Sequence, residues 1–422
     1  MKEISHILTR QKQEIKEKLQ GEIVERDIET KIKKDVEKNI IKVITGVRRC
    51  GKSTLALLLL KNKNFGYVNF DEKGLIDIKL DTLLSSVKEI YSNVKILLLD
   101  EIQNIDGWEL WVNSLQRKGY NLIVTGSNSR LLSKELATHL TGRYIEFEIF
   151  PFSFREFLRL KKVDLTDINY LKEKQGIVKN LLREYINKGG FPEYIVKELS
   201  KDYLLTLFKA IIYNDVVKRW KIKYAAKIED LARYIISIYS REFSATKLKK
   251  ILGFKSTFTV LNYIKYLKEA FLFFELERFS FKEKGFMKAP KKIYSIDLGL
   301  SNAVAVGVSK NLGLKMENIV FLSLKRMGLR ENKEIFYFKN HSGEVDFIIK
   351  QGLKIKQLIQ ICHNIDDYET KKRELKSLLK ASKELKCKDL LIITWDYEGE
   401  EKIDGRKIKF IPLWKWLIIH SK

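Results

Sequence analysis

Hydrophobic and polar positions follow one pattern over the first 150 residues and a different pattern thereafter. Largely apolar runs, each bounded by small or charged residues, lie at 41–44, 66–71, 95–99, 121–124 and 144–150. Continuous apolar runs are typical of strands in a parallel sheet that is covered on both faces. Helical patterns follow the first run at 54–60 and the fourth run at 129–140. The pattern predicts an α/β fold with a parallel sheet.

Beyond residue 150 the pattern is mainly helical at first. Pro151 interrupts the chain, and Ser153 can cap a helix that starts at the next residue. Changes of pattern then divide the rest of the chain. The predicted segments are a helical lead-in (1–36), an α/β core (37–150), a helical lid (151–225), a winged-helix-like segment (226–285) and a nuclease-like α/β domain (286–422).

A glycine-rich motif joins the first predicted strand to the first predicted helix. Residues 46–53 read Gly-Val-Arg-Arg-Cys-Gly-Lys-Ser, which matches the phosphate-binding loop Gly-x-x-x-x-Gly-Lys-Ser. Backbone N–H groups of such a loop and the helix N-terminus cradle phosphates. Lys52 would reach the β- and γ-phosphates, and Ser53 would bind Mg²⁺. The predicted nucleotide-binding residues are Gly46, Val47, Arg48, Arg49, Cys50, Gly51, Lys52, Ser53 and Thr54.

Two carboxylates end the third apolar run. Asp100 and Glu101 follow Leu97-Leu98-Leu99 directly. Asp100 is predicted to hold the Mg²⁺ shell, and Glu101 to polarise the water that attacks the γ-phosphate. An acidic pair that only caps the next helix is the alternative, but its position soon after a phosphate-binding loop favours ATP hydrolysis.

Polar residues follow the fourth apolar run as well. Ser127 or Asn128 could offer a hydroxyl or an amide to the γ-phosphate, and the sequence does not choose between them. Arg143 precedes the fifth run. It could stabilise transition-state charge on the nucleotide of a neighbouring subunit, or it could form a structural ion pair.

The order of these motifs resembles a known family. Four segments read GVRRCGKST, LLLDEIQNIDGWE, IVTGSNSRLLSKELATHLTGR and FEIFPFSFREF. Together they resemble the prokaryotic AAA-superfamily ATPases of the STAND-like archaeal group. Three later segments, NKGGFPE, PKKIYSIDLGL and GEVDF, are similar to the domain of unknown function 4143 that follows such modules. The resemblance implies an AAA-type P-loop NTPase fold with ATP and Mg²⁺ as its ligands.

Composition narrows the class of protein further. The 422 residues include no apolar run near the ~18 residues that cross a bilayer, and the N-terminus does not read as a signal peptide. The spacing of Cys50, Cys362 and Cys387 suggests neither disulfides nor zinc. We therefore expect a cytoplasmic protein without a membrane partner.

The charge is strongly positive. Eighty Lys and Arg residues against 54 Asp and Glu residues give a formal net charge of +26. Such an excess favours association with nucleic acid. A general compositional bias toward lysine could produce the same excess.

Residues 228–267 carry a helix-turn-helix pattern. Helical stretches at 228–238, 244–252 and 256–267 are interrupted by Gly253, and strands of a wing could follow at 271–279. Possible contacts to double-stranded DNA near the start of the last helix are Lys255, Ser256, Thr257 and Thr259. Winged helices that contact only protein are the alternative.

The C-terminal domain is expected to be restriction-endonuclease-like. Such folds place a Glu on a helix, an Asp on a strand and a Glu/Asp-x-Lys motif on the next strand. Glu317 and Asp346 fit the first two positions, but Gln360 and Cys362 stand where the acid and the lysine belong. Because glutamine carries no charge for a metal and cysteine no ammonium, nuclease activity is not expected.

The sequence as a whole predicts an ATPase that acts as a nucleotide-dependent switch. One alternative is an ATP-dependent nucleic-acid-processing enzyme with nuclease activity. Another is a protein-binding scaffold that makes no DNA contact. Partners could be DNA, an unknown protein or further copies of the chain.

Overall fold

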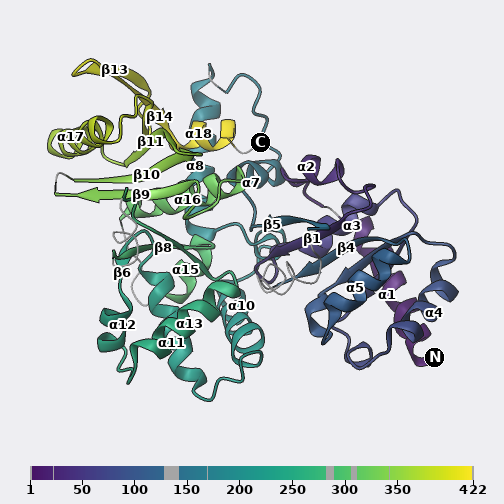
Figure 1. Ribbon diagram of the computed structural model, residues 1–422. Helices are drawn as coiled ribbons and strands as arrows, with labels where there is room; N and C mark the ends of the chain where they lie inside the picture. Colours follow the sequence, from purple (N-terminus) through teal and green to yellow (C-terminus); the bar gives the residue numbers. More distant parts are fainter. Residues whose placement is uncertain are drawn as a thin grey trace. The chain divides into compact units, whose positions relative to one another are not determined.

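A computed structural model shows two compact units, the first built mainly from residues 1–151 and the second from 152–268 and 272–422. The residues it describes are 2–21, 23–127, 142–168, 170–281, 289–305, 311–341 and 343–420. Each unit is described by itself below, with the element labels of Figure 1. Among the described residues no helix is long and apolar enough to cross a membrane.

The first unit is built on a five-stranded parallel sheet with the order β2-β3-β4-β1-β5 (Figure 1). Its strands are β1 (Ile41–Gly46), β2 (Phe65–Asn69), β3 (Ile96–Asp100), β4 (Asn121–Gly126) and β5 (Tyr144–Ile149). All neighbours pair in parallel. The sheet confirms the predicted α/β class and fits a P-loop NTPase core.

Helices flank this sheet. They are α1 (Lys2–Gln20), α2 (Glu29–Lys33), α3 (Lys52–Leu60), α4 (Leu80–Tyr91) and α5 (Trp108–Arg117), with single 3₁₀ turns at Lys73–Leu75 and Ile102–Asn104. The leucine-rich α3 buries most of its residues, and α1 packs on α4 and β2. The predicted helix at 129–140 lies outside the described residues.

The second unit begins with helices: α7 (Phe154–Leu160), α8 (Lys172–Lys188), α9 (Pro192–Val196), α10 (Lys201–Ala210), a π-helix (Ile211–Val217) and α11 (Ala225–Ser237). The predicted cap at Ser153 is confirmed. The Ser153 side chain accepts a hydrogen bond from the Glu156 N–H, and the Glu156 carboxylate accepts from the Ser153 N–H at 2.8 Å. This reciprocal pair satisfies two N–H groups at the start of α7.

Three motifs that carry the family resemblance meet at one buried junction within this unit. The Asp297 carboxylate accepts hydrogen bonds from the N–H groups of Gly190, at 2.7 Å, and Leu300, at 2.9 Å. The Phe152 N–H donates to the Gly190 carbonyl at 2.7 Å. A Cβ on Gly299 would lie 1.9 Å from the Lys188 carbonyl oxygen, so the chains approach too closely for a side chain. The three motifs therefore hold the start of α7, the end of α8 and the start of α15 together.

A small antiparallel sheet and two further helices follow. The helices are α12 (Ala245–Ile251) and α13 (Thr257–Glu269), and the strands are β6 (Glu242–Phe243), β7 (Phe273–Leu276) and β8 (Lys291–Ser295). The strand order is β6-β8-β7. The Ser244 side chain caps α12 by accepting a hydrogen bond from the Lys247 N–H.

The C-terminal part contains a six-stranded mixed sheet with the order β13-β14-β12-β11-β10-β9. Its strands are β9 (Ile335–Asn340), β10 (Gly343–Gln351), β11 (Lys354–Cys362), β12 (Leu390–Thr394), β13 (Gly399–Ile403) and β14 (Arg406–Pro412). The accompanying helices are α15 (Leu298–Val304), α16 (Leu312–Arg326), α17 (Tyr368–Glu384) and α18 (Leu413–His420).

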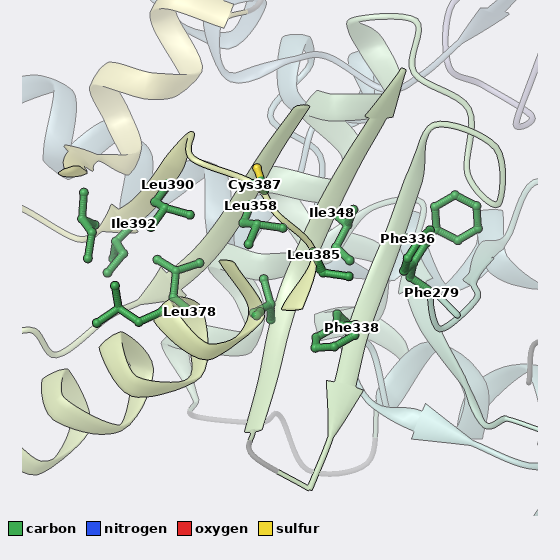
Figure 2. Close-up of a cluster of buried hydrophobic side chains, with 14 of the residues drawn as sticks. Phe279, Phe336, Phe338, Ile348, Leu358, Leu378, Leu385, Cys387, Leu390 and Ile392 are labelled. Atoms are coloured by element: carbon green, nitrogen blue, oxygen red, sulfur yellow. The ribbon is translucent and has the colours of Figure 1, made fainter. Parts of the chain in front are cut away.

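A hydrophobic cluster joins α17 to this sheet. Leu378 of α17 packs with Leu358, Leu390 and Ile392 of the strands, and all four side chains are buried (Figure 2). Burial of apolar surface, at roughly 25 cal/mol per Å², stabilises this packing.

Candidate nucleotide-binding site

The phosphate-binding loop has the tight backbone that its sequence predicts. Gly46 ends β1 with φ +150°, and Gly51 precedes α3 with φ +98°. A Cβ on Gly46 would lie 2.1 Å from the Ile149 carbonyl oxygen, so no side chain fits there. The first N–H groups of the nine-residue α3 have no acceptor within the helix. This end of the sheet therefore offers donors to an anion.

Lys52 turns back onto the loop. Its side chain is almost fully buried, and Nζ donates to the Val47 carbonyl at 3.2 Å. The same ammonium lies 3.7 Å from Oε1 of Glu101. The lysine and the glutamate that were predicted from separate motifs are thus neighbours.

Asp100 is surrounded by hydroxyl groups. Its carboxylate accepts hydrogen bonds from Ser53 Oγ and from the Tyr67 hydroxyl, each at 2.8 Å, and also from Thr125 Oγ1. Burial raises the pKa of Asp100, and the neighbouring Glu101 charge adds to this effect, while the three hydroxyls oppose it. Ser53 and Asp100 were predicted to share a metal ion, and they lie within hydrogen-bond distance.

Glu101 adopts a left-handed backbone conformation with φ +52°. Its N–H donates to Thr125 Oγ1 at 3.1 Å. Burial alone would raise the pKa of Glu101, but the Lys52 and Arg48 charges and the hydrogen bonds with Gln103 and Ser127 together lower it. The carboxylate is therefore ionised, as a group that accepts a proton from water must be.

Sequence reasoning missed three residues of this site, and two of them are Thr125 and Tyr67. Thr125 lies two residues before Ser127 on β4, and Tyr67 lies on β2. Strands β2 and β4 both pair with β3. Their hydroxyls reach Asp100 only because β3 lies between them, and nothing in the local pattern signals that order.

Arg26 is the third missed residue. Its guanidinium is buried and donates to the Cys50 carbonyl of the loop at 2.9 Å and to the Phe150 carbonyl at 2.6 Å. Both acceptors are backbone groups at the carboxyl edge of the sheet. Arg26 therefore ties the phosphate-binding loop to the end of β5.

The remaining predicted residues lie as follows. Ser127 is buried at the end of β4, and its hydrogen bond helps to lower the pKa of Glu101. Asn128 lies outside the described residues. Arg143 is exposed at the start of β5, and its carbonyl accepts from the Ile41 N–H. Because parallel β1 has six residues, at ~3.3 Å each, Arg143 lies roughly 20 Å from its own loop.

The predicted site residues of the second unit lie in two separate groups. Lys255 and Ser256 are exposed just before α13, and Thr257 and Thr259 are partly exposed in its first turn. In the C-terminal part Glu317 of α16 and Asp346 of β10 both contact Lys292. Gln360 Oε1 accepts from the Asp346 N–H at 3.3 Å, while Cys362 belongs to the hydrophobic cluster beneath α17.

The residues of the first site fit ATP with Mg²⁺. Gly46 lets the loop backbone pack closely against the Ile149 carbonyl, and Lys52 supplies a positive charge at the loop. The oxygens of Ser53 and Asp100 are the ligand type that Mg²⁺ takes in proteins.

Comparison with known proteins gives the class first. Residues 38–158 match the family model of an AAA domain, and residues 179–315 match a domain of unknown function, DUF8612. The first unit is therefore an AAA-type P-loop domain. The expected domain 4143 stays a prediction, because the matching domain carries a different number.

The particular family follows from full-length relatives. The chain is 40% identical over 423 residues to the uncharacterized protein MJ1544 of Methanocaldococcus jannaschii, which covers 95% of this chain and 92% of the relative. It is 30% identical to an uncharacterized protein of Haemophilus influenzae, over 89% of this chain and 94% of the relative. The chain belongs to the family of these proteins.

Among solved structures, the Walker-type ATPase PABY2304 of Pyrococcus abyssi aligns with 67% of this chain and 96% of its own. The identity is 14% and the TM-score 0.44. A similarity this low says nothing about activity.

Proposed function

We propose that the protein binds and hydrolyses ATP with Mg²⁺ and acts as a nucleotide-dependent switch. One observation carries the proposal: Lys52, Ser53, Asp100 and Glu101 meet at the carboxyl edge of the sheet, next to a loop that only glycine can form. Ligands of open α/β sheets bind at this edge.

Each side chain has a defined part in this proposal. Lys52 leaves the Val47 carbonyl and binds the β- and γ-phosphates. Ser53 and Asp100 hold the metal ion, which when bound neutralises phosphate charge. Lys52 already lies beside Glu101, so the ammonium that would bind the phosphates is also next to the carboxylate that would act on water.

Glu101 is the group that orients and deprotonates the attacking water. Thr125 holds the backbone of Glu101 and the carboxylate of Asp100 at the same time. General-base catalysis by such a positioned carboxylate contributes typically 10²- to 10⁴-fold to the rate.

Substitution of the loop lysine tests ATP binding. Lys52→Ala is expected to lose MgATP affinity and phosphate release together, because the loop loses the ammonium proposed to bind the β- and γ-phosphates. Lys61→Ala, at an exposed position after the same helix, is the matched control and should keep both. Unchanged affinity in Lys52→Ala would contradict the proposed site.

A second proposal concerns DNA. The order α11, β6, α12, α13, β7 and β8, with an antiparallel β6-β8-β7 sheet, supports a winged-helix module with α13 as its recognition helix. Lys250 is exposed in the last turn of α12, and Lys255 is exposed just before α13. A protein partner is the alternative, because Phe258 and Leu261 on α13 are 71% and 51% exposed.

Charge reversal separates these partners. Lys250→Glu combined with Lys255→Glu is expected to weaken double-stranded DNA binding and to reduce its salt slope by about 1 for each lysine that no longer binds a phosphate. The control is Lys376→Glu with Lys380→Glu, which makes the same charge change at exposed positions of α17. Equal weakening in both variants would show a general charge effect and contradict DNA binding by α13.

A further inference from the structure

A buried lysine lies among three carboxylates in the C-terminal part of the chain. Lys292 of β8 places Nζ 2.8 Å from Glu317 Oε1, 2.6 Å from Glu344 Oε1 and 3.4 Å from Asp346 Oδ1. Glu317 comes from α16, and the other two carboxylates come from β10. Three elements therefore converge on one ammonium.

The surroundings hold these carboxylates in place. The Tyr294 hydroxyl donates to Glu317 Oε1 at 2.7 Å, and the Ile361 N–H donates to Asp346 Oδ2 at 2.9 Å. Lys292 is 3% exposed, and Glu317 and Asp346 are 5% and 8% exposed. An ionised carboxylate would not remain so deeply buried without a compensating charge.

We propose that the Lys292 ammonium is a built-in cation that occupies the position a divalent metal ion would take among Glu317, Glu344 and Asp346. The carboxylates then organise the fold without any metal. Glu317 and Asp346 are the positions that the nuclease-like pattern assigns to metal binding, so the lysine closes that site.

Charge balance supports this assignment. Burial opposes the charged form of Lys292, but the three carboxylates outweigh burial and raise its pKa well above the usual value. Lys339, 3.2 Å from Glu344, supplies the second positive charge to the group. Lys292 and Lys339 together offset two of the three carboxylate charges of this group.

The distances also suit an ammonium. Oxygens at 2.6–2.8 Å are at charge-assisted hydrogen-bond distance, whereas Mg²⁺ requires about 2.1 Å. With Lys292 among them, the three carboxylates are not arranged to hold a metal ion, and neither is any other group of three or more His, Cys, Asp or Glu side chains among the described residues. With Lys292 removed, the three carboxylate oxygens would move inward by about 0.5 to 1.3 Å to bind a metal ion at about 2.1 Å.

The test is Mn²⁺ binding in the full chain without nucleotide. Lys292→Met is expected to bind Mn²⁺ and to gain about 5 °C or more in melting temperature at saturation, because three carboxylates are left without their cation. Only the rise in melting temperature that disappears in the double variant Lys292→Met with Asp346→Asn is assigned to this site. Lys291→Met, beside it on β8, is the matched control and should gain nothing.

Two results would overturn the proposal. One is Mn²⁺ binding or Mn²⁺-dependent DNA nicking by the wild type that Asp346→Ala abolishes, since the site would then be open. The other is a folded Lys292→Met that Mn²⁺ does not stabilise. If Lys292→Met folds only with Mn²⁺, the proposal stands. If it does not fold at all, Lys292→Met with Glu344→Gln, which removes one repelling charge, must show the Mn²⁺ effect.

Discussion

At the scale of single residues, one hydroxyl connects the two acidic groups of the nucleotide site. Thr125 donates to the Asp100 carboxylate and accepts from the Glu101 N–H. Tyr67 and Ser53 complete the ring of hydroxyls around Asp100. The positions of both carboxylates therefore depend on a residue that belongs neither to the phosphate-binding loop nor to the acidic pair that follows β3.

Replacing this hydroxyl tests its role. Thr125→Val keeps the shape but leaves the Glu101 N–H without its acceptor, so we expect ATP hydrolysis to fall by at least about tenfold while MgATP affinity changes little. Thr125→Ser keeps the hydroxyl and should retain most of the rate. Phosphate release and nucleotide titration measure the two quantities, and a wild-type rate in Thr125→Val would contradict the assigned role.

Lys42 shows the cost of a buried charge. This residue of β1 is fully buried and donates to the Lys38 carbonyl and to Asn121, and burial lowers its pKa to about 8. The unfolded chain then holds the Lys42 proton more tightly than the folded chain does. The contribution of Lys42 to the free energy of unfolding is therefore lowest below pH 8. It rises as the pH increases from about 8 to 10.5.

The variant Lys42→Met lacks this titration. Relative to the variant, the wild type should gain up to about 3 kcal/mol of unfolding free energy between pH 8 and 10.5. Chemical unfolding at both ends of this range measures the change. Lys61→Met, at an exposed position, is the control and should follow the wild type. A constant difference between wild type and Lys42→Met would mean that the lysine is not desolvated.

At the scale of elements, the sequence predicted the parts whose signals are local. The strands of the first unit, the loop between β1 and α3 and the Ser153 cap follow from apolar runs and from spacing over four to eight residues. The missed residues depend on strand order. Thr125 and Tyr67 reach Asp100 across two strand pairs, and Lys292 enters the carboxylate group from β8. The repeat of hydrophobic and polar residues within one strand or helix does not show which residues of other elements will lie beside it.

Gly176 within α8 and Gly190 just after it offer a matched test of the close packing at the junction with Phe152. Gly190 follows α8, and a Cβ there would lie 2.4 Å from the Phe152 carbonyl oxygen, so Gly190→Ala should destabilise the second unit by at least about 2 kcal/mol. Gly176 lies within α8 with nothing within 4 Å of its Cβ position. Gly176→Ala should be neutral or stabilise by about 0.5–1 kcal/mol. Equal melting temperatures would contradict the close junction.

At the scale of the whole molecule, the proposed switch raises the question of further copies. Arg143 lies at the amino edge of the sheet, and the loop of the same chain lies at the carboxyl edge. The arginine cannot reach its own nucleotide across the length of β1. If it acts in catalysis, it acts on a second copy of the chain.

Mixing two variants with impaired turnover tests this arrangement. Arg143→Ala should lower turnover without weakening ATP binding, and Glu101→Gln should block turnover. A mixture of the two should recover part of the activity, because Arg143 of a Glu101→Gln copy can serve the intact site of an Arg143→Ala copy. Activity that equals the sum of the separate variants would contradict action between copies.

The central claim is that Lys52, Ser53, Asp100 and Glu101 form one ATP-hydrolysing site. The most direct measurement compares MgATP affinity and phosphate release in wild type and Glu101→Gln. We predict affinity within about threefold of wild type and a rate at least about 100-fold lower, since the carboxylate acts on water and Lys52 acts on phosphate. A Glu101→Gln variant that hydrolyses ATP at the wild-type rate would contradict the account.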